Sequence, residues 1–273
     1  MEINGKTFSQ YAELLKNAGS SRTGMRPNWV RREAVSRSQT GRIKEYFKAN
    51  AGLDLDAIEK STETMWEKAL TLAAFVARNI PHDNQKAGLK KRNAVSLWEY
   101  ARQYPTGFNC RWHAILLSEL LLAVGIKNCF VTCLPEDKND NDCHVVNLVW
   151  LPERNKWAML DSDMTEYAAD EKGVPLSLRE MREAVRDGRA FSIRPLPGFE
   201  DAWIGTESGR EYMRCYWAKN LYWFARHTSV RYDLESGFCF ADRYICLVPA
   251  GYQYDRQKFG GLETTDESAF WDI

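Results

Sequence analysis

One stretch of the sequence constrains the fold more than any other, the apolar run between Gly107 and Gly125. Its large apolar residues recur at helical spacing and further leucines fill neighbouring positions, so the predicted helix is apolar around most of its girth. Such a helix must be enclosed on most sides, and we expect it in the middle of a core. Gly125 is a natural stop, and Asn109 is a suitable N-cap that places Cys110 in the first turn.

Other helices are indicated on both sides of this run. Thr64 and Glu67 form a capping box that opens a helix, which ends before Pro81 because proline disfavours helical geometry in the preceding residue. A second helix is expected from Val95 to Gln103. Further along, we expect a polar helix over 177–187. A second helix, over 208–224, begins with a capping box at Ser208 and carries an aromatic stripe. A strand is expected over 244–248.

Two strands are expected after the apolar helix, over 144–151 and 156–161. A four-residue turn between them would pair Trp150 with Trp157. On that register His144 lies opposite Asp163 and diagonal to Asp161, which is about 7–8 Å away by backbone geometry. Either carboxylate can then orient the imidazole, and the register alone leaves both open.

Cys110 and His144 are the best candidates for a nucleophile and its base. The thiolate form of cysteine is the nucleophile, and both a helix N-terminus and a nearby imidazolium favour that form. Cys110 stands at the start of the buried helix, where its backbone N–H can also help to bind an oxyanion. His113, one turn later, is a rival base, but it would have to bend back toward the N-terminus, and no nearby acid is expected to orient it.

These residues resemble the transglutaminase-like superfamily, which includes transglutaminases, peptide N-glycanases and bacterial proteins assigned as cysteine proteases. The resemblance lies in a Gly-x-x-Cys at the head of an apolar helix that ends in Gly-Ile, a strand that begins with His, and a Lys-Trp-x-x-x-Asp. It covers roughly Met65 to Phe191 and implies a triad of Cys110, His144 and Asp161. Ser162 stands where the family usually has proline, which leaves a role open for Asp163.

The resemblance implies an α+β fold of the transglutaminase-like or papain-like type, in which the nucleophile helix packs on an antiparallel sheet. Three segments are expected: a helical N-terminal segment over 1–60, the catalytic core over 61–191, and an aromatic-rich C-terminal extension over 192–273. The extension is expected to pack on the core, so that the three form one compact unit.

The implied activity is cysteine-dependent acyl transfer on amide bonds of a peptide or protein, through a thioester intermediate. Water as the acceptor gives a peptidase or amidase, which the resemblance favours. The alternatives are a transglutaminase-type transfer to an amine and a binding protein that keeps the fold without the chemistry. Gln103 is a candidate second donor to the oxyanion.

Composition and motifs limit the classes of partner and the compartment that we expect. The formal net charge is zero and no nucleic-acid motif is present, so no nucleic-acid partner is expected. No apolar run approaches the roughly 20 residues that span a bilayer, and no signal peptide is visible. The seven cysteines show no disulfide framework, which favours the cytoplasm. No metal or cofactor is expected, since Cys129, Cys133, Cys143 and His144 do not form a recognised zinc-ligand set.

Overall fold

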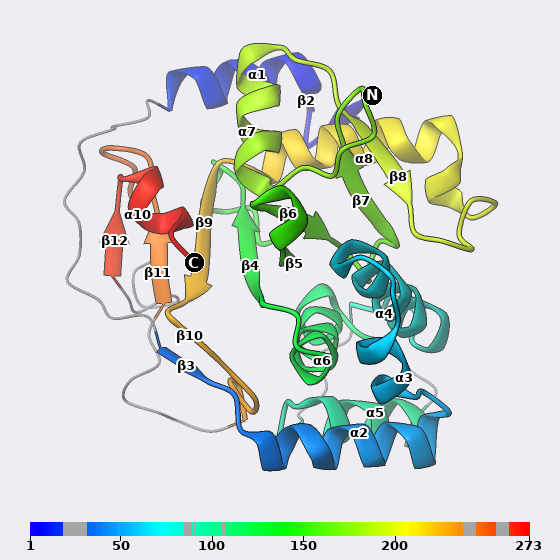
Figure 1. Ribbon diagram of the computed structural model, residues 1–273. Coiled ribbons are helices and arrows are strands. Elements are labelled where there is room, and N and C mark those ends of the chain that lie inside the picture. Colours follow the sequence, from blue (N-terminus) through cyan, green and yellow to red (C-terminus); the bar gives the residue numbers. More distant parts are fainter. Residues whose placement is uncertain (19–31, 85–88, 90, 105–106, 237–243, 255–261) are drawn as a thin grey trace.

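The computed structural model describes residues 1–18, 32–84, 89, 91–104, 107–236, 244–254 and 262–273. Within these residues the fold is α+β, as the sequence predicted, and it is built around a six-stranded sheet (Figure 1). Neighbouring strands of this sheet are antiparallel except for β11 and β12. The strand order is β12 (Leu262–Thr264), β11 (Tyr244–Leu247), β9 (Trp223–His227), β4 (Asn128–Leu134), β5 (His144–Leu151) and β6 (Lys156–Leu160).

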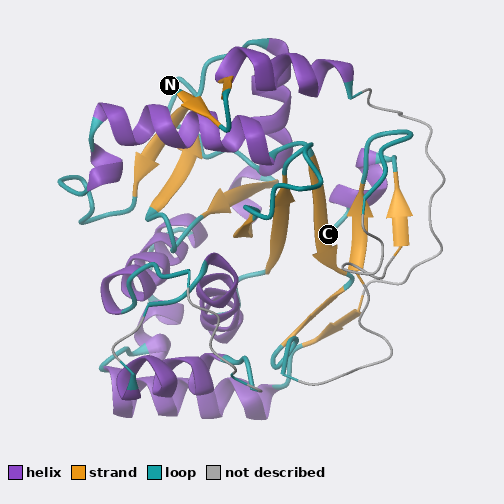
Figure 2. Cartoon of the chain, turned by 180° about the vertical axis from the view of Figure 1, so that it is seen from behind, coloured by secondary structure: helices purple, strands orange, loops and turns teal. Residues whose placement is uncertain are grey.

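The apolar helix α6 (Cys110–Ala123) lies where its composition requires. Every residue from Trp112 to Ala123 is buried. One side of α6 packs on β4 and β5, and other helices cover the rest (Figures 1 and 2). These helices are α2 (Arg37–Ala51), α4 (Met65–Asn79) and α5 (Ala94–Gln103). The prediction of a nucleophile helix packed on an antiparallel sheet is therefore confirmed.

Local signals set the ends of these helices. The capping box of Thr64 and Glu67 is present at the start of α4. The Asn109 side chain accepts the backbone N–H of Trp112 at 3.2 Å, so that Cys110 is the first residue of α6. Gly125 follows the helix with φ at +75°, a conformation that glycine adopts without steric cost.

The pairing of β5 with β6 differs from the predicted register at one end. Trp150 pairs with Trp157 as predicted, but the ladder stops at Asn147 and Leu160. Asp161 turns instead toward Glu166, with which it exchanges two backbone hydrogen bonds of 3.0 Å. The prediction that His144 lies opposite Asp163 is therefore wrong, because a tight turn carries Asp163 out of the strand.

The helix predicted over 208–224 begins and ends earlier in the structure than in the prediction. Helix α8 (Glu207–Asn220) is capped by Thr206, whose side chain accepts the Gly209 N–H, and not by Ser208. It ends before Phe224, which lies in β9. Because β9 lies between β4 and β11 and is mostly buried, its run of apolar residues has no period that distinguishes strand from helix.

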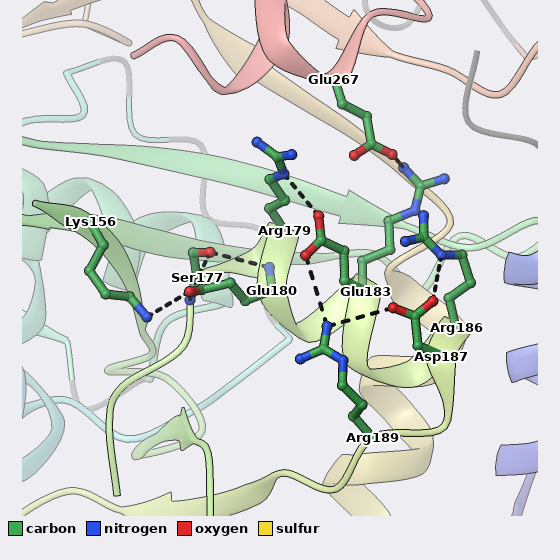
Figure 3. Close-up of polar contacts among 10 residues, drawn as sticks. Lys156, Ser177, Arg179, Glu180, Glu183, Arg186, Asp187, Arg189 and Glu267 are labelled. Atoms are coloured by element: carbon green, nitrogen blue, oxygen red, sulfur yellow. Dashed lines mark hydrogen bonds and ion pairs between the residues drawn. The ribbon is translucent and has the colours of Figure 1, made fainter. Parts of the chain in front are cut away.

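A helical layer covers one end of the sheet. Helix α1 (Phe8–Asn17) packs against α7 (Leu178–Asp187) and α8. Figure 3 shows how ion pairs hold α7. Lys156 of β6 donates to Glu180 at 2.8 Å. Arg182 donates at 3.4 Å to Glu267, which is the first residue of α10 (Glu267–Trp271). The N-terminal and C-terminal segments thus contact one another through α7 and α8.

Shorter elements complete the described chain. They are β1 (Glu2–Ile3), β2 (Lys6–Thr7), β3 (Arg32–Ala34), α3 (Leu55–Lys60), η1 (Pro152–Arg154), β7 (Glu166–Ala169), β8 (Ser192–Pro195), η2 (Trp203–Gly205) and β10 (Ser229–Arg231). Within the described ranges, no helix combines the length and the apolar character needed to cross a bilayer.

Candidate active site

The site begins at Cys110, where α6 reaches the surface. Cys110 is partly exposed, whereas the helix is fully buried from Trp112 onward. The first backbone N–H groups of a helix have no intrahelical partners and form its positive end. The thiol therefore combines solvent access with a favourable environment for negative charge.

A second backbone segment is fastened beside the nucleophile. Phe108 donates its N–H to the Pro81 carbonyl at 2.9 Å and accepts the N–H of Asp83 at 2.8 Å. A Cβ atom built on Gly107 would lie 2.3 Å from the Pro81 carbonyl oxygen, so only glycine fits there. This close approach pairs His82 with Phe108, two residues before Cys110.

His144 and Asp161 form a buried hydrogen-bonded pair. His144 is the first residue of β5, and its Nε2–H donates to Asp161 Oδ2 at 2.6 Å. The two residues are 2% and 1% exposed, so water does not compete for this bond. The second oxygen of Asp161 accepts the backbone N–H groups of Asp163 and Met164 at 2.9 and 3.1 Å. Both oxygens of Asp161 are thereby held in place.

The other side of the imidazole faces the thiol. Cys110 Sγ, a ring nitrogen of His144 and a carboxylate oxygen of Asp163 all lie within 4.8 Å of one another. Since Nε2 bonds Asp161, Nδ1 is the nitrogen left for Cys110. Burial alone would lower the pKa of His144, but the Asp161 carboxylate and the Cys110 thiol outweigh it and hold that pKa well above its usual range. This environment favours an imidazolium beside the sulfur.

Two rings from α8 enclose His144. The rings of Tyr216 and Trp217 lie edge-on to the imidazole at centroid distances of 5.5 and 5.4 Å. Trp217 Nε1–H also donates to Glu166 Oε1 at 2.6 Å. The sequence predicted the aromatic stripe of this helix but not its contact with the site. No local pattern signals it, because α8 is more than sixty residues from His144 along the chain.

Asp163, the rival acid, has different partners. Its carboxylate accepts the Nδ1–H of His82 at 2.9 and 3.0 Å, and it lies 3.5 Å from His113 Nε2. The bond to Asp163 raises the pKa of His82. Burial lowers the pKa of His113, whose Nε2 also lies 3.4 Å from the Pro81 carbonyl. The expectation that no acid lies near His113 is therefore wrong, although burial favours the neutral form of this ring.

Other residues named from the sequence lie on α5 and β4. Gln103 is the last residue of α5 and is exposed, and its role as an oxyanion donor stays a prediction. Cys129 and Cys133 are buried in β4, and the second of them pairs with His144 across the sheet. The described cysteines are all free thiols, in agreement with the absence of a disulfide framework in the sequence.

Comparison with known proteins supports the family resemblance of this segment. Residues 55–162 match the family model of the transglutaminase-like superfamily, which confirms the resemblance over a segment that contains Cys110, His144 and Asp161. No curated protein matches the chain. Among solved structures, the chain is similar to a putative cysteine protease from Cytophaga hutchinsonii, with 17% identity and a TM-score of 0.33. The match covers 47% of this chain and 39% of that one.

Proposed function

We propose that this protein is a cysteine-dependent acyl-transfer enzyme that acts on amide bonds. Cys110 is the nucleophile, His144 the general acid and base, and Asp161 the group that orients His144. One observation carries the proposal: a partly exposed thiol adjoins a buried imidazole, whose far nitrogen lies 2.6 Å from a carboxylate. The match of residues 55–162 to the transglutaminase-like superfamily supports it.

The reaction proceeds in two halves. The Cys110 thiolate attacks the carbonyl carbon, His144 gives its proton to the leaving nitrogen, the C–N bond breaks, and a thioester remains. An acceptor then attacks the thioester while His144 removes its proton, and the C–S bond breaks to release the thiolate. The backbone N–H of Cys110 stabilises the oxyanion in both halves, with Gln103 as the proposed second donor.

The substrate is proposed to be a peptide or protein, and the acceptor water. An amine acceptor is the alternative. Incubation of the protein with a peptide mixture and a fluorescent primary amine separates the two. New peptide fragments that depend on Cys110 would support hydrolysis, and Cys110-dependent attachment of the amine to a peptide would support the transglutaminase reaction.

The proposed pairing of thiol and imidazole is tested by the rate of iodoacetamide labelling at Cys110, measured by mass spectrometry from about pH 5 to about pH 9. We expect rapid labelling that persists well below about pH 7, because the imidazolium stabilises the thiolate. The variant His144→Ala should lose this labelling at low pH. Asp161→Asn should reduce it less, since the imidazole remains.

The variant Cys110→Ser measures the background from other thiols, in particular the partly exposed Cys143. Labelling of Cys110 with the pH dependence of an ordinary thiol, unchanged by His144→Ala, would contradict the proposal. That outcome would favour a binding protein that keeps the fold without the chemistry.

A further inference from the structure

The Cys110 cluster contains more ligands than the proposed reaction uses. In the proposed reaction Asp161 bonds the Nε2 atom of His144. The carboxylate of Asp163 has no part in that reaction, yet it lies within 4.8 Å of both the thiol and the imidazole. Asp163 is 5% exposed and held in position by His82. We propose that Cys110, His144 and Asp163 bind a zinc ion that blocks the nucleophile reversibly.

The donor atoms suit zinc better than other common cations. Thiolate sulfur, imidazole nitrogen and carboxylate oxygen are all zinc ligands, whereas calcium and magnesium bind oxygen almost exclusively. Zinc bonds of about 2.0–2.3 Å in tetrahedral geometry place ligand atoms about 3.5 Å apart. Small side-chain rotations within the 4.8 Å cluster reach that spacing.

Two contacts already provide the outer support that zinc sites require. Asp161 accepts the second ring N–H of His144, which fixes the ring and leaves Nδ1 to bind the metal. His82 donates to both oxygens of Asp163, at 2.9 and 3.0 Å, which fixes the carboxylate. Three of the four zinc ligands thus come from the protein, and the fourth position remains for water.

Binding releases the proton that the thiol and the imidazole share, because zinc needs the thiolate and the neutral ring. The Cys110 sulfur is then bonded to the metal and cannot attack a carbonyl or an alkylating agent. The inference rests on the proposed function in one respect: zinc at Cys110 inhibits the protein only if Cys110 is its nucleophile. Zinc binding itself requires no turnover.

The test is a zinc titration of the full chain, reduced and freed of metal, in competition with a chromogenic zinc chelator. We expect one zinc per chain in the wild type. Cys110→Ser should abolish this binding, and Asp163→Asn should weaken it at least about tenfold. Asp187→Asn is the matched control, since Asp187 lies on α7 among exposed ion pairs and should leave the affinity unchanged (Figure 3).

Cobalt(II) provides a second measurement that does not depend on enzyme activity. Bound at this site, it should show a sulfur-to-cobalt charge-transfer absorption that disappears in Cys110→Ser. Thermal unfolding of each variant identifies any that fails to fold. Full zinc affinity in Cys110→Ser, or an affinity of folded Asp163→Asn equal to that of Asp187→Asn, would overturn the proposal and leave the proposed acyl transfer untouched.

Discussion

At the scale of single residues, two aspartates two positions apart have separate tasks because a turn begins between them. Asp161 follows Leu160, the last paired residue of β6, and one oxygen of its carboxylate bonds His144 while the other accepts the N–H groups of the turn. Asp163 then faces His82 and the thiol side of the cluster. The sequence located the pair but could not divide the roles, since the turn changes the direction of the backbone after Leu160.

The pair of His82 and Asp163 predicts a specific pH dependence of stability. Because the folded-state pKa of His82 is raised, its contribution to the unfolding free energy is complete below about pH 6.5 and is lost as the pH rises through the folded value. We therefore expect wild type to lose more stability than His82→Gln above about pH 6.5, as measured by urea unfolding.

A double-mutant cycle is the control for this prediction. In an Asp163→Asn background the carboxylate that raises the pKa of His82 is gone. His82→Gln should then no longer alter how the unfolding free energy changes with pH. If the unfolding free energies of wild type and His82→Gln changed equally with pH, the predicted pH-dependent contribution of the pair would be refuted.

At the scale of elements, α8 connects the C-terminal region to the candidate site through Trp217. Burial and the nearby Asp161 carboxylate raise the pKa of Glu166 well above its usual range, which favours the neutral form of this side chain. Trp217 supplies the hydrogen bond to its Oε1, and the buried Oε2 has no partner among the described residues. Glu166 therefore relies on a single bond from α8.

Replacement of Trp217 by phenylalanine should lower the unfolding free energy by about 1–3 kcal/mol, the cost of a buried polar group without a partner. Trp217 is fully buried, so the smaller phenylalanine ring adds a packing cost to the loss of the hydrogen bond. Trp203→Phe is the matched control, because Trp203 is 51% exposed and its replacement should change stability by less than about 0.5 kcal/mol. Equal effects of the two variants would refute the role given to α8. Chemical denaturation measures both.

The elements that the sequence predicted well are those with strong local signals. The capping box at Thr64, the N-cap Asn109 and the apolar girth of α6 each determine structure within a few residues. Strand β9 was missed for the opposite reason. Its neighbour β4 comes from a segment far from it in the chain, and nothing in Trp223–His227 itself reveals that pairing.

At the scale of the whole molecule, the predicted catalytic core over 61–191 depends on the chain that follows it. Strand β9 pairs with β4 in the middle of the sheet, and α8 covers His144. We expect a 61–191 fragment to show no cooperative thermal transition by circular dichroism, because β4 would lose a partner and the core its cover. The full chain, measured in parallel, is the control. Cooperative unfolding of the fragment would support an independent domain with the predicted boundaries.

The tight contact at Gly107 has a consequence for how homologous sequences diverge. The Pro81 carbonyl oxygen lies where any side chain at this position would begin, so the two segments cannot change independently. Positions 81–83 and 107 are expected to covary in evolution. Homologues with a larger residue at 107 should have moved the neighbouring segment, and with it lost the histidine at position 82 that holds Asp163.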